Sequence, residues 1–265
     1  MRAYRIAYDG RPFHGFQRQP DVGTVADELL AALDRLGVTD GAVPEGYAAA
    51  GRTDAGVSAL AQTVAFGAPD WLSPAAFNSE LPASVRAWAS ASVPETFHAT
   101  HDAARRRYTY HLHAPAVDDK RARTALSALT GEHDFHNLTP DETGTVRDLS
   151  MELHRDGEFL VVGLTADGFC RQLVRRVVGL VAEIARGQRE PSAVDRVLAP
   201  EPLDGPEGVA PAPAQPLVLT GVDYPGVEFT TDADALESAR KVFGDLRAQR
   251  AAGTRVAGTV LDGLE

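Results

Sequence analysis

The stretch GRTDAG, residues 51–56, carries a single carboxylate on a short loop with a glycine at each end. The apolar run YAAA (47–50) precedes the loop, and QTVAF (62–66) follows it as a predicted strand. Glycine permits the backbone angles of a sharp turn, so this frame can hold Asp54 at the lip of a cleft. Arg52 can keep that carboxylate ionised and can also bind a phosphate. The same residue types are common in turns that do no chemistry, and residue types alone favour that interpretation.

Bulk composition is that of a soluble globular protein. The 265 residues, 44% hydrophobic and 24% charged, are enough for one large domain or two of ordinary size. No apolar run approaches the ~20 residues that span a bilayer, and the N-terminus lacks the apolar centre of a signal peptide. Cys170 is the only cysteine, so neither an intramolecular disulfide nor a cysteine-cluster metal site is possible. We expect a cytoplasmic protein without a membrane partner.

The chain is acidic, and nearly all of its basic residues are arginines. Asp plus Glu number 37 and Lys plus Arg 26, which gives a net charge of -11, and only Lys120 and Lys241 are lysines. Such a surface as a whole binds polyanions poorly. Arginines nevertheless gather in residues 105–123 and 171–189. An acidic body with few lysines suggests a halophilic protein adapted to high salt, although a GC-rich genome also favours arginine over lysine.

Apolar periodicity and turn residues predict strand pairs that alternate with single helices. A capping box at Thr24 and Asp27 starts a helix that Gly37 ends. Asp156-Gly157 is a two-residue hairpin turn. Strands are predicted at 3–8, 47–50, 62–66, 85–93, 107–113, 148–155, 158–166 and 217–222, and further helices near 74–77 and at 123–130, 169–186 and 232–251. This order predicts an α+β fold with a mostly antiparallel sheet.

Two segments allow more than a secondary-structure prediction. In the helix predicted at 169–186, apolar residues fall on one face, and Arg171, Arg175 and Arg186 on the other. Such a basic face is either solvated or turned to a phosphate backbone, and spacing alone favours neither. Residues 199–216 contain six prolines and are predicted to form a surface excursion outside the core.

Several common site types are absent from the sequence. It contains no glycine-rich phosphate loop, no GxGxxG and no GxSxG, so no nucleotide cofactor is expected. His111 and His113 lie two apart on a predicted strand, and His133 and His136 lie three apart. Neither pair has the matched carboxylates of a zinc enzyme, so we expect polar packing there and no bound metal.

The run RRRYTY, residues 105–110, enters a strand on which Tyr108 and Tyr110 point to the same side. An aromatic ring beside arginines suits stacking on a nucleobase while guanidinium groups hold phosphates. The competing interpretation is core packing, which is common for tyrosines on strands.

The aspartate loop stands in an ordered set of motifs. They are YDG at 8–10, GFQRQ at 15–19, Asn78 with Leu81-Pro82, FHA at 97–99, RRYTY at 106–110, GEHDF at 131–135, residues 169–179 and VDYP at 222–225. Together with GRTDAGV at 51–57, this set resembles the tRNA pseudouridine synthase A family over residues 3–225. The loop alone is a highly specific match, and the ordered set is more specific still.

The resemblance implies roles for individual residues. Asp54 aligns with the catalytic aspartate that attacks the target uridine, and Arg175 with the basic residue that pairs with it. Tyr108 aligns with the tyrosine that stacks on the target base. Arg52 aligns with the arginine of the signature loop that helps to handle the flipped nucleotide.

Two further arginines, Arg107 and Arg171, are assigned to substrate binding. Bacterial members commonly have two histidines where this chain has Arg171-Gln172, so RNA contacts there are expected to differ. The fold that the resemblance implies has two similar α+β halves whose antiparallel sheets join around a central cleft. Residues 1–104 would carry the aspartate loop, and residues 105–265 the stacking tyrosine and the basic helix.

The implied activity is isomerisation of uridine to pseudouridine at positions 38, 39 and 40, in the anticodon stem-loop of tRNA. The resemblance also implies a homodimer that needs no cofactor. Two other classes stay open. One is a non-catalytic RNA-binding protein on the same fold. The other is a hydrolase with a carboxylate nucleophile, such as a glycosidase, which needs a second carboxylate ~5–9 Å away; none stands near Asp54 in the sequence.

Overall fold

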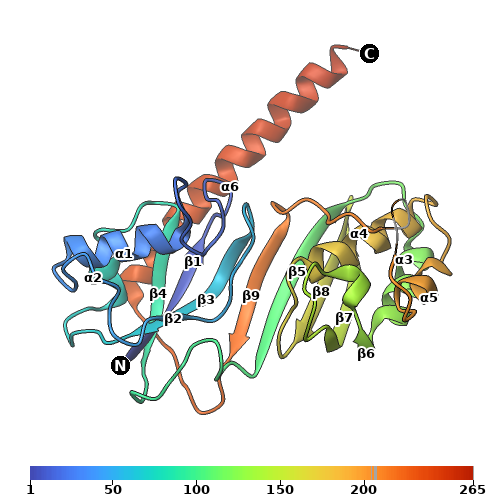
Figure 1. The fold of residues 1–265 in the computed structure, drawn as a ribbon. Coiled ribbons are helices and arrows are strands. Elements are labelled where there is room, and N and C mark those ends of the chain that lie inside the picture. The colour runs from blue at the N-terminus through green and yellow to red at the C-terminus, as the bar shows by residue number, and fades with distance from the viewer. Residues whose placement is uncertain (204, 206–207, 265) are drawn as a thin grey trace.

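One mixed sheet runs through the whole molecule in the computed structural model, which describes residues 1–203, 205 and 208–264 (Figure 1). Its strand order is β10-β4-β1-β3-β9-β5-β8-β7-β6, with β2 paired to β3. The strands are β1 (Arg2–Tyr8), β2 (Ala48–Ala49), β3 (Ser58–Phe66), β4 (Val85–Ser92), β5 (Arg105–His113), β6 (Gly131–Asp134), β7 (Val146–Asp156), β8 (Phe159–Ala166), β9 (Leu217–Asp223) and β10 (Thr230–Thr231). Among the described strands, β3 and β9 pair in parallel and the other pairs are antiparallel. The predicted α+β class is confirmed.

The N-terminal portion of the sheet is covered by helix α1 (Val25–Arg35), with the short helix α2 (Pro74–Asn78) beside β4. The predicted capping box is confirmed, because Thr24 Oγ1 accepts from the amide of Asp27 while an Asp27 carboxylate oxygen accepts from the amide of Thr24. Leu29 and Leu33 are fully buried against the sheet, which accounts for the amphipathic pattern.

The C-terminal portion is covered by helices α3 (Asp119–Leu129), α4 (Leu173–Ala185) and α5 (Ala193–Val197), with the 3-10 helix η1 at His136–Leu138. Helix α4 begins four residues later than the sequence predicts. The reason is Gln172, whose φ of 60° lies in the left-handed region and cannot belong to the helix. The row of Arg171, Arg175 and Arg186 on one helical face is therefore wrong, since Arg171 precedes the helix.

The proline-rich segment 199–216 is partly buried, which corrects its prediction as a surface excursion. Val209, Ala212 and Ala214 belong to the core beside α4. The backbone of the segment packs closely against helix α4 at Gly179, where an added Cβ atom would lie 2.4 Å from the carbonyl oxygen of Ala210. Small side chains allow this close packing, and the prolines mask it in the sequence. Pro206 lies outside the described residues.

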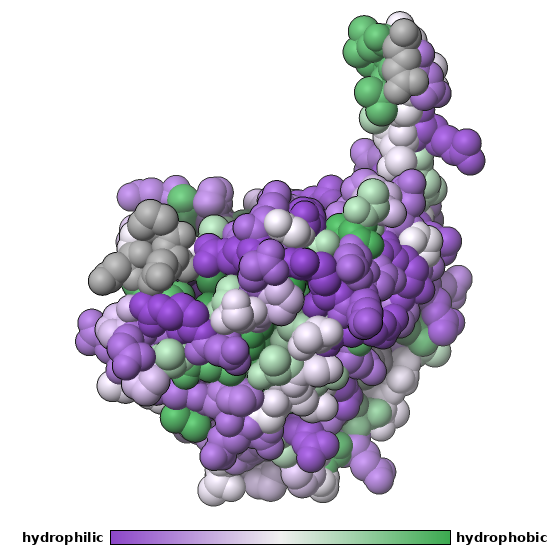
Figure 2. Space-filling model, turned by 90° about the vertical axis from the view of Figure 1, so that its right-hand side faces the viewer, coloured by the Kyte–Doolittle hydropathy of each residue, from purple (hydrophilic) through white to green (hydrophobic). Residues whose placement is uncertain are grey.

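Helix α6 (Ala233–Asp262) begins beside β4 and continues eleven residues beyond its predicted end at 251. Ala235 and Ala239 are buried against the body, whereas the distal part projects away from it (Figure 1). Figure 2 shows hydrophobic side chains along one side of the tip, where Val256, Val260 and Leu261 are exposed. Strand β10 and helix α6 belong to the predicted C-terminal half by sequence but pack on β4 of the N-terminal half. The predicted division of the chain at residue 104 stays a prediction.

Candidate active site

The aspartate loop, residues 51–57, joins β2 to β3. Gly56 has a φ of 82°, and the amide of Val57 donates to the carbonyl of Asp54 over 3.1 Å, so the chain turns sharply here. The buried Gln62 donates through Nε2 to the carbonyl of Gly51 over 2.9 Å. The hydroxyls of Thr53 and Tyr8 lie 2.7 Å apart in the core. The first part of the loop is thereby fixed to the sheet.

A second loop, the N-terminal loop of residues 9–16, forms a wall against the aspartate loop. The amide of Phe16 donates to the carbonyl of Thr53 over 3.1 Å, and the amide of Gly56 donates to the carbonyl of Phe13 over 3.3 Å. A Cβ atom at Gly10 would lie 2.0 Å from the carbonyl oxygen of Val57, so only glycine permits this approach.

Asp54 is held by an arginine that is 121 positions away in the sequence. Nη1 of Arg175, in the first turn of α4, lies 2.9 Å from Oδ2 of Asp54. Arg175 Nε also donates to the carbonyl of Ala212 over 2.7 Å, and the amide of Ala212 returns a bond to the carbonyl of Arg175. The guanidinium is thus oriented before any substrate binds. The Asp54 side chain keeps 31% of its surface exposed, so it is accessible to a ligand.

The sheet topology explains this meeting. Strands β3 and β9 are parallel, with Ser58 opposite Val218, so the loops that precede them lie at the same end of the sheet. The aspartate loop precedes β3, and the segment around Ala212 precedes β9 and packs on α4. Asp54 and Arg175 meet across that junction.

Tyr108 on β5 completes the group. Its ring contacts Phe169 edge to face, with ring centroids 5.2 Å apart. Burial raises the pKa of Tyr108 to about 12, while nearby Arg106 lowers it and nearby Asp54 raises it further. The phenol is therefore protonated at neutral pH, and its environment includes the Asp54 carboxylate. The ring is half-buried, which leaves a surface on which a base can stack.

Arg106, rather than Arg107, lies on the Tyr108 side of the strand. It donates to the carbonyls of Ala50 (2.8 Å) and Thr100 (2.7 Å) and to that of Asp167, so it ties β5 to the entrance of the aspartate loop. Sequence reasoning missed this residue, although side chains alternate along a strand and Arg106 stands two positions from Tyr108.

In the part of the chain that the structure describes, the remaining predicted arginines make no hydrogen bond or ion pair with Asp54. Arg107 is on the opposite face of β5, where its two terminal nitrogens lie 2.9 Å from the carboxylate oxygens of Asp223. Arg171 pairs with Asp141 at 3.3 Å and is 60% exposed. Arg52 is exposed and, within the described residues, makes no hydrogen bond or ion pair. The substrate roles of all three stay predictions.

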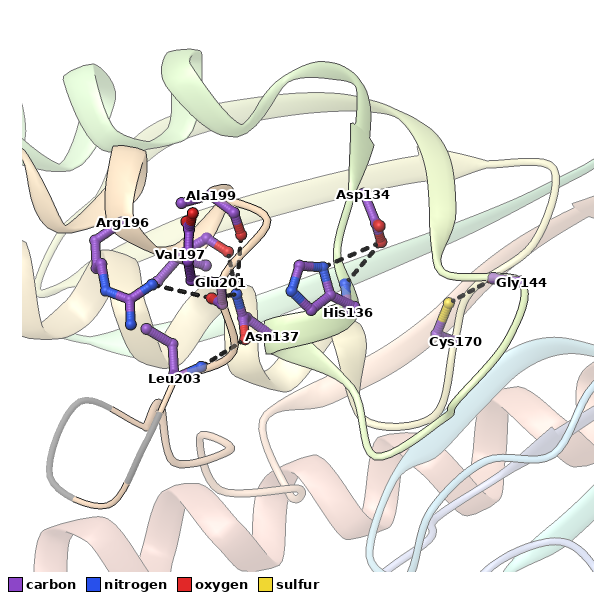
Figure 3. A network of polar contacts seen from close by, with 10 residues as sticks. All are labelled: Asp134, His136, Asn137, Gly144, Cys170, Arg196, Val197, Ala199, Glu201 and Leu203. Carbon is purple, nitrogen blue, oxygen red and sulfur yellow. Dashed lines mark hydrogen bonds and ion pairs between the residues drawn. The ribbon is translucent and has the colours of Figure 1, made fainter.

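Polar contacts near η1 fix the segment that follows α5 and the segment that precedes α4 (Figure 3). The Asn137 amide group donates to the carbonyls of Val197, Ala199 and Glu201 and accepts from the amide of Leu203. The Cys170 thiol, just before α4, donates to the carbonyl of Gly144 over 3.2 Å. His136 pairs with Asp134 at 3.4 Å. These contacts are structural.

Within residues 1–203, 205 and 208–264, no three His, Cys, Asp or Glu side chains are grouped so as to hold a metal ion. No helix in the same described part of the chain has the length and apolar character needed to cross a bilayer.

Comparison with known proteins shows the family. A family model described as tRNA pseudouridine synthase matches residues 125–225. A tRNA pseudouridine synthase A from Haloarcula marismortui is 62% identical over 275 residues, which cover all of both chains. The protein of that name from Natronomonas pharaonis is 61% identical over 98% of both chains. The one from Methanosarcina acetivorans is 37% identical over 99% of this chain and 97% of its own.

The first two relatives come from halophilic archaea, while adaptation of this chain to high salt stays a prediction. Pseudouridine synthases are isomerases. The sequence motifs, the ion pair of Asp54 with Arg175 and the full-length relatives all point to this family. The chain belongs to the tRNA pseudouridine synthase family.

Proposed function

We propose that the protein isomerises uridine to pseudouridine at positions 38, 39 and 40 in the anticodon stem-loop of tRNA, with Asp54 as the nucleophile. The observation that carries the proposal is the ion pair between Asp54 and Arg175 on a glycine-framed loop. The substrate class follows from the family, and the anticodon stem-loop from the similarity of residues 51–57 to the family's signature.

The reaction conserves every atom of the nucleotide. The bond between N1 of uracil and C1′ of ribose breaks, the base turns, and a bond forms between C5 and C1′. The proton lost from C5 is balanced by a proton gained at N1. No oxidant, reductant or net hydrolysis is involved, so the chemistry needs a carboxylate and a closed site rather than a cofactor.

Asp54 is suited to attack because its carboxylate is held in one orientation and is only partly solvated. Arg175 donates to it over 2.9 Å and is itself only 16% exposed, so the guanidinium is placed to stabilise the charge on this carboxylate. Attack on C1′ of the ribose and attack on C6 of the base are both compatible with this arrangement.

Tyr108 and the arginines would handle the nucleotide. The target base must leave its stack to reach a carboxylate on the protein, and an aromatic face stabilises the extruded base. Tyr108 offers that face beside Asp54. Exposed Arg52 stands two residues from Asp54 and would hold a flanking phosphate, with Arg171 contacting the backbone further away. A homodimer would let one tRNA lie across both subunits.

Site-resolved pseudouridine mapping tests the assignment. Unmodified tRNAs that carry uridine at 38, 39 or 40 would be incubated with the protein and mapped. Pseudouridine at these positions alone supports the proposal, and modification elsewhere in the tRNA contradicts it. A protein that binds tRNA without making pseudouridine would instead be the non-catalytic RNA-binding protein that sequence alone leaves open.

A further inference from the structure

Asp9, at the end of β1, is a nearly buried carboxylate whose charge is met by the C-terminal helix. Its side chain is only 10% exposed, and Oδ2 lies 2.6 Å from Nη2 of Arg250 on α6. Among the described residues, the other hydrogen bond to this carboxylate comes from the amide of Arg11, over 3.4 Å. The pair joins residues 241 apart in sequence. Arg250 lies beyond residues 3–225, over which the motifs match, so the motif resemblance gives it no role.

Asp9 also begins the N-terminal loop that packs against the aspartate loop. The amide of Gly10 donates to the hydroxyl of Ser58 over 3.0 Å, directly after the aspartate loop. The N-terminal loop then contributes the bonds between Phe16 and Thr53 and between Phe13 and Gly56. A displacement of Asp9 would therefore move the backbone that supports Asp54.

We propose that Arg250 is a positioning residue for uridine isomerisation. It neutralises Asp9 and so holds the N-terminal loop against the aspartate loop. The proposal rests on the proposed role of Asp54. It assigns to α6 a task at the site in addition to packing on β4.

The ion pair of Arg250 with Asp9, rather than packing alone, holds the N-terminal loop in place. An ionised carboxylate that loses its partner while buried must recover water or take up a proton. Asp9 recovers water most readily by moving outward, and its neighbour Gly10 has no room to adjust against Val57. The N-terminal loop would then leave the aspartate loop. Displacements of ~1 Å at a reacting group cost about 100-fold in rate.

The test compares Arg250→Ala, Arg250→Lys and Arg247→Ala in the full-length protein. Arg247 is exposed on the same helix and, among the described residues, its side chain makes no hydrogen bond or ion pair, so it controls for loss of an arginine from α6. Single-turnover rates and tRNA dissociation constants would be measured below the unfolding temperature. Amide hydrogen exchange at Phe16 and Gly56 reports loop contact independently of activity.

Arg250→Ala should lower the turnover rate about 10- to 100-fold, leave tRNA affinity within about 3-fold and accelerate exchange at both amides. Arg250→Lys should recover most of the rate, and Arg247→Ala should match the wild type. Unchanged rate and exchange in Arg250→Ala would overturn the proposal. So would equal losses of tRNA affinity in the two alanine variants, which would make α6 an RNA-binding arm.

If Arg250→Ala does not fold, Arg250→Gln takes its place, since glutamine keeps a long polar side chain on α6 and leaves the Asp9 carboxylate without its opposite charge. Slower turnover and faster exchange support the pair, and wild-type values contradict it. Failure of the underlying function is separate. It would show as turnover in an Asp54→Asn variant, whereas the exchange measurement tests Arg250 whatever Asp54 does.

Discussion

Arg175 Nη1 and Asp54 Oδ2 lie 2.9 Å apart although 121 residues separate them in the chain. Asp54 lies on a loop before β3 and Arg175 on helix α4, and the parallel pair of β3 and β9 joins the two portions of the molecule that carry them. The geometry of the site therefore depends on how the two portions of the sheet are joined. Arg106 secures the same junction from β5, through the carbonyls of Ala50 and Asp167.

Two substitutions of Arg175 distinguish the effect of its charge from the effect of its hydrogen bond to the carbonyl of Ala212. Arg175→Ala should lower the turnover rate by about 100-fold or more, because the Asp54 carboxylate loses the guanidinium that orients it at 2.9 Å and stabilises its charge. Arg175→Lys should fall between, since it keeps the charge and loses the donor to Ala212. Arg186→Ala, an exposed arginine at the end of the same helix, is the control. Single-turnover kinetics decide, and a rate for Arg175→Ala within about 3-fold of wild type would refute the pair's role.

Tyr108 is expected to act through its ring. Within the described residues its hydroxyl makes no hydrogen bond, so Tyr108→Phe should keep turnover within about 5-fold. Tyr108→Ala removes the stacking face and should reduce turnover by at least about 10-fold, because base stacking contributes ~1–3 kcal/mol. Circular dichroism and thermal unfolding check that both variants fold. A folded Tyr108→Ala variant with full activity would contradict the stacking role and indicate that the ring only packs in the core.

Buried tyrosines predict the alkaline stability of the fold. Burial raises the pKa of Tyr4, Tyr108, Tyr110 and Tyr224 to about 12, from about 10 in the unfolded chain. Between these values the folded state binds more protons than the unfolded state, so stability falls as pH rises. Below about pH 9 these groups should have no effect.

Urea unfolding measured from pH 8 to 11.5 checks this expectation. The free energy of unfolding should decline steeply above pH 10, and Tyr108→Phe should reduce the slope. A flat profile up to pH 11.5 would contradict the burial of these phenols.

Two helical glycines should respond oppositely to alanine. Gly179→Ala on α4 places a methyl group against the carbonyl of Ala210, which should destabilise the fold by ~1–3 kcal/mol. At Gly253 on α6 an added Cβ atom meets no atom of the described residues within 4 Å, so Gly253→Ala should be neutral or stabilising by up to ~1 kcal/mol. Chemical denaturation of the two variants gives the comparison. Equal effects would mean that residues 208–216 do not pack on α4.

Helix starts and tight turns were predicted correctly where they depend on residues close together in the sequence. The capping box at Thr24 fixed the start of α1, and the turn Asp156-Gly157 joins β7 and β8. The glycine frame of Asp54 forms the predicted sharp loop. Each of these features depends on residues within a few positions of one another, so the sequence pattern contains the cause.

Features that depend on distant contacts were missed. The left-handed turn at Gln172 carries no glycine, so no sequence signal places the start of helix α4 after residue 172. The burial of Ala212 depends on Gly179, and the prolines around it indicate a loop. Gly253 within α6 suggests an end that the structure does not have. The pairing of Asp54 with Arg175 follows from sheet topology, and the sequence indicates it only through family resemblance.

The central claim is that Asp54 is the single carboxylate on which uridine isomerisation depends. The most direct test is single-turnover pseudouridine formation by Asp54→Asn on unmodified tRNA, with the tRNA dissociation constant measured in parallel. Asparagine keeps the size of the side chain and removes its charge and nucleophilicity. We expect no detectable pseudouridine and a dissociation constant within a few-fold of wild type. Substantial turnover in the folded variant would contradict the account.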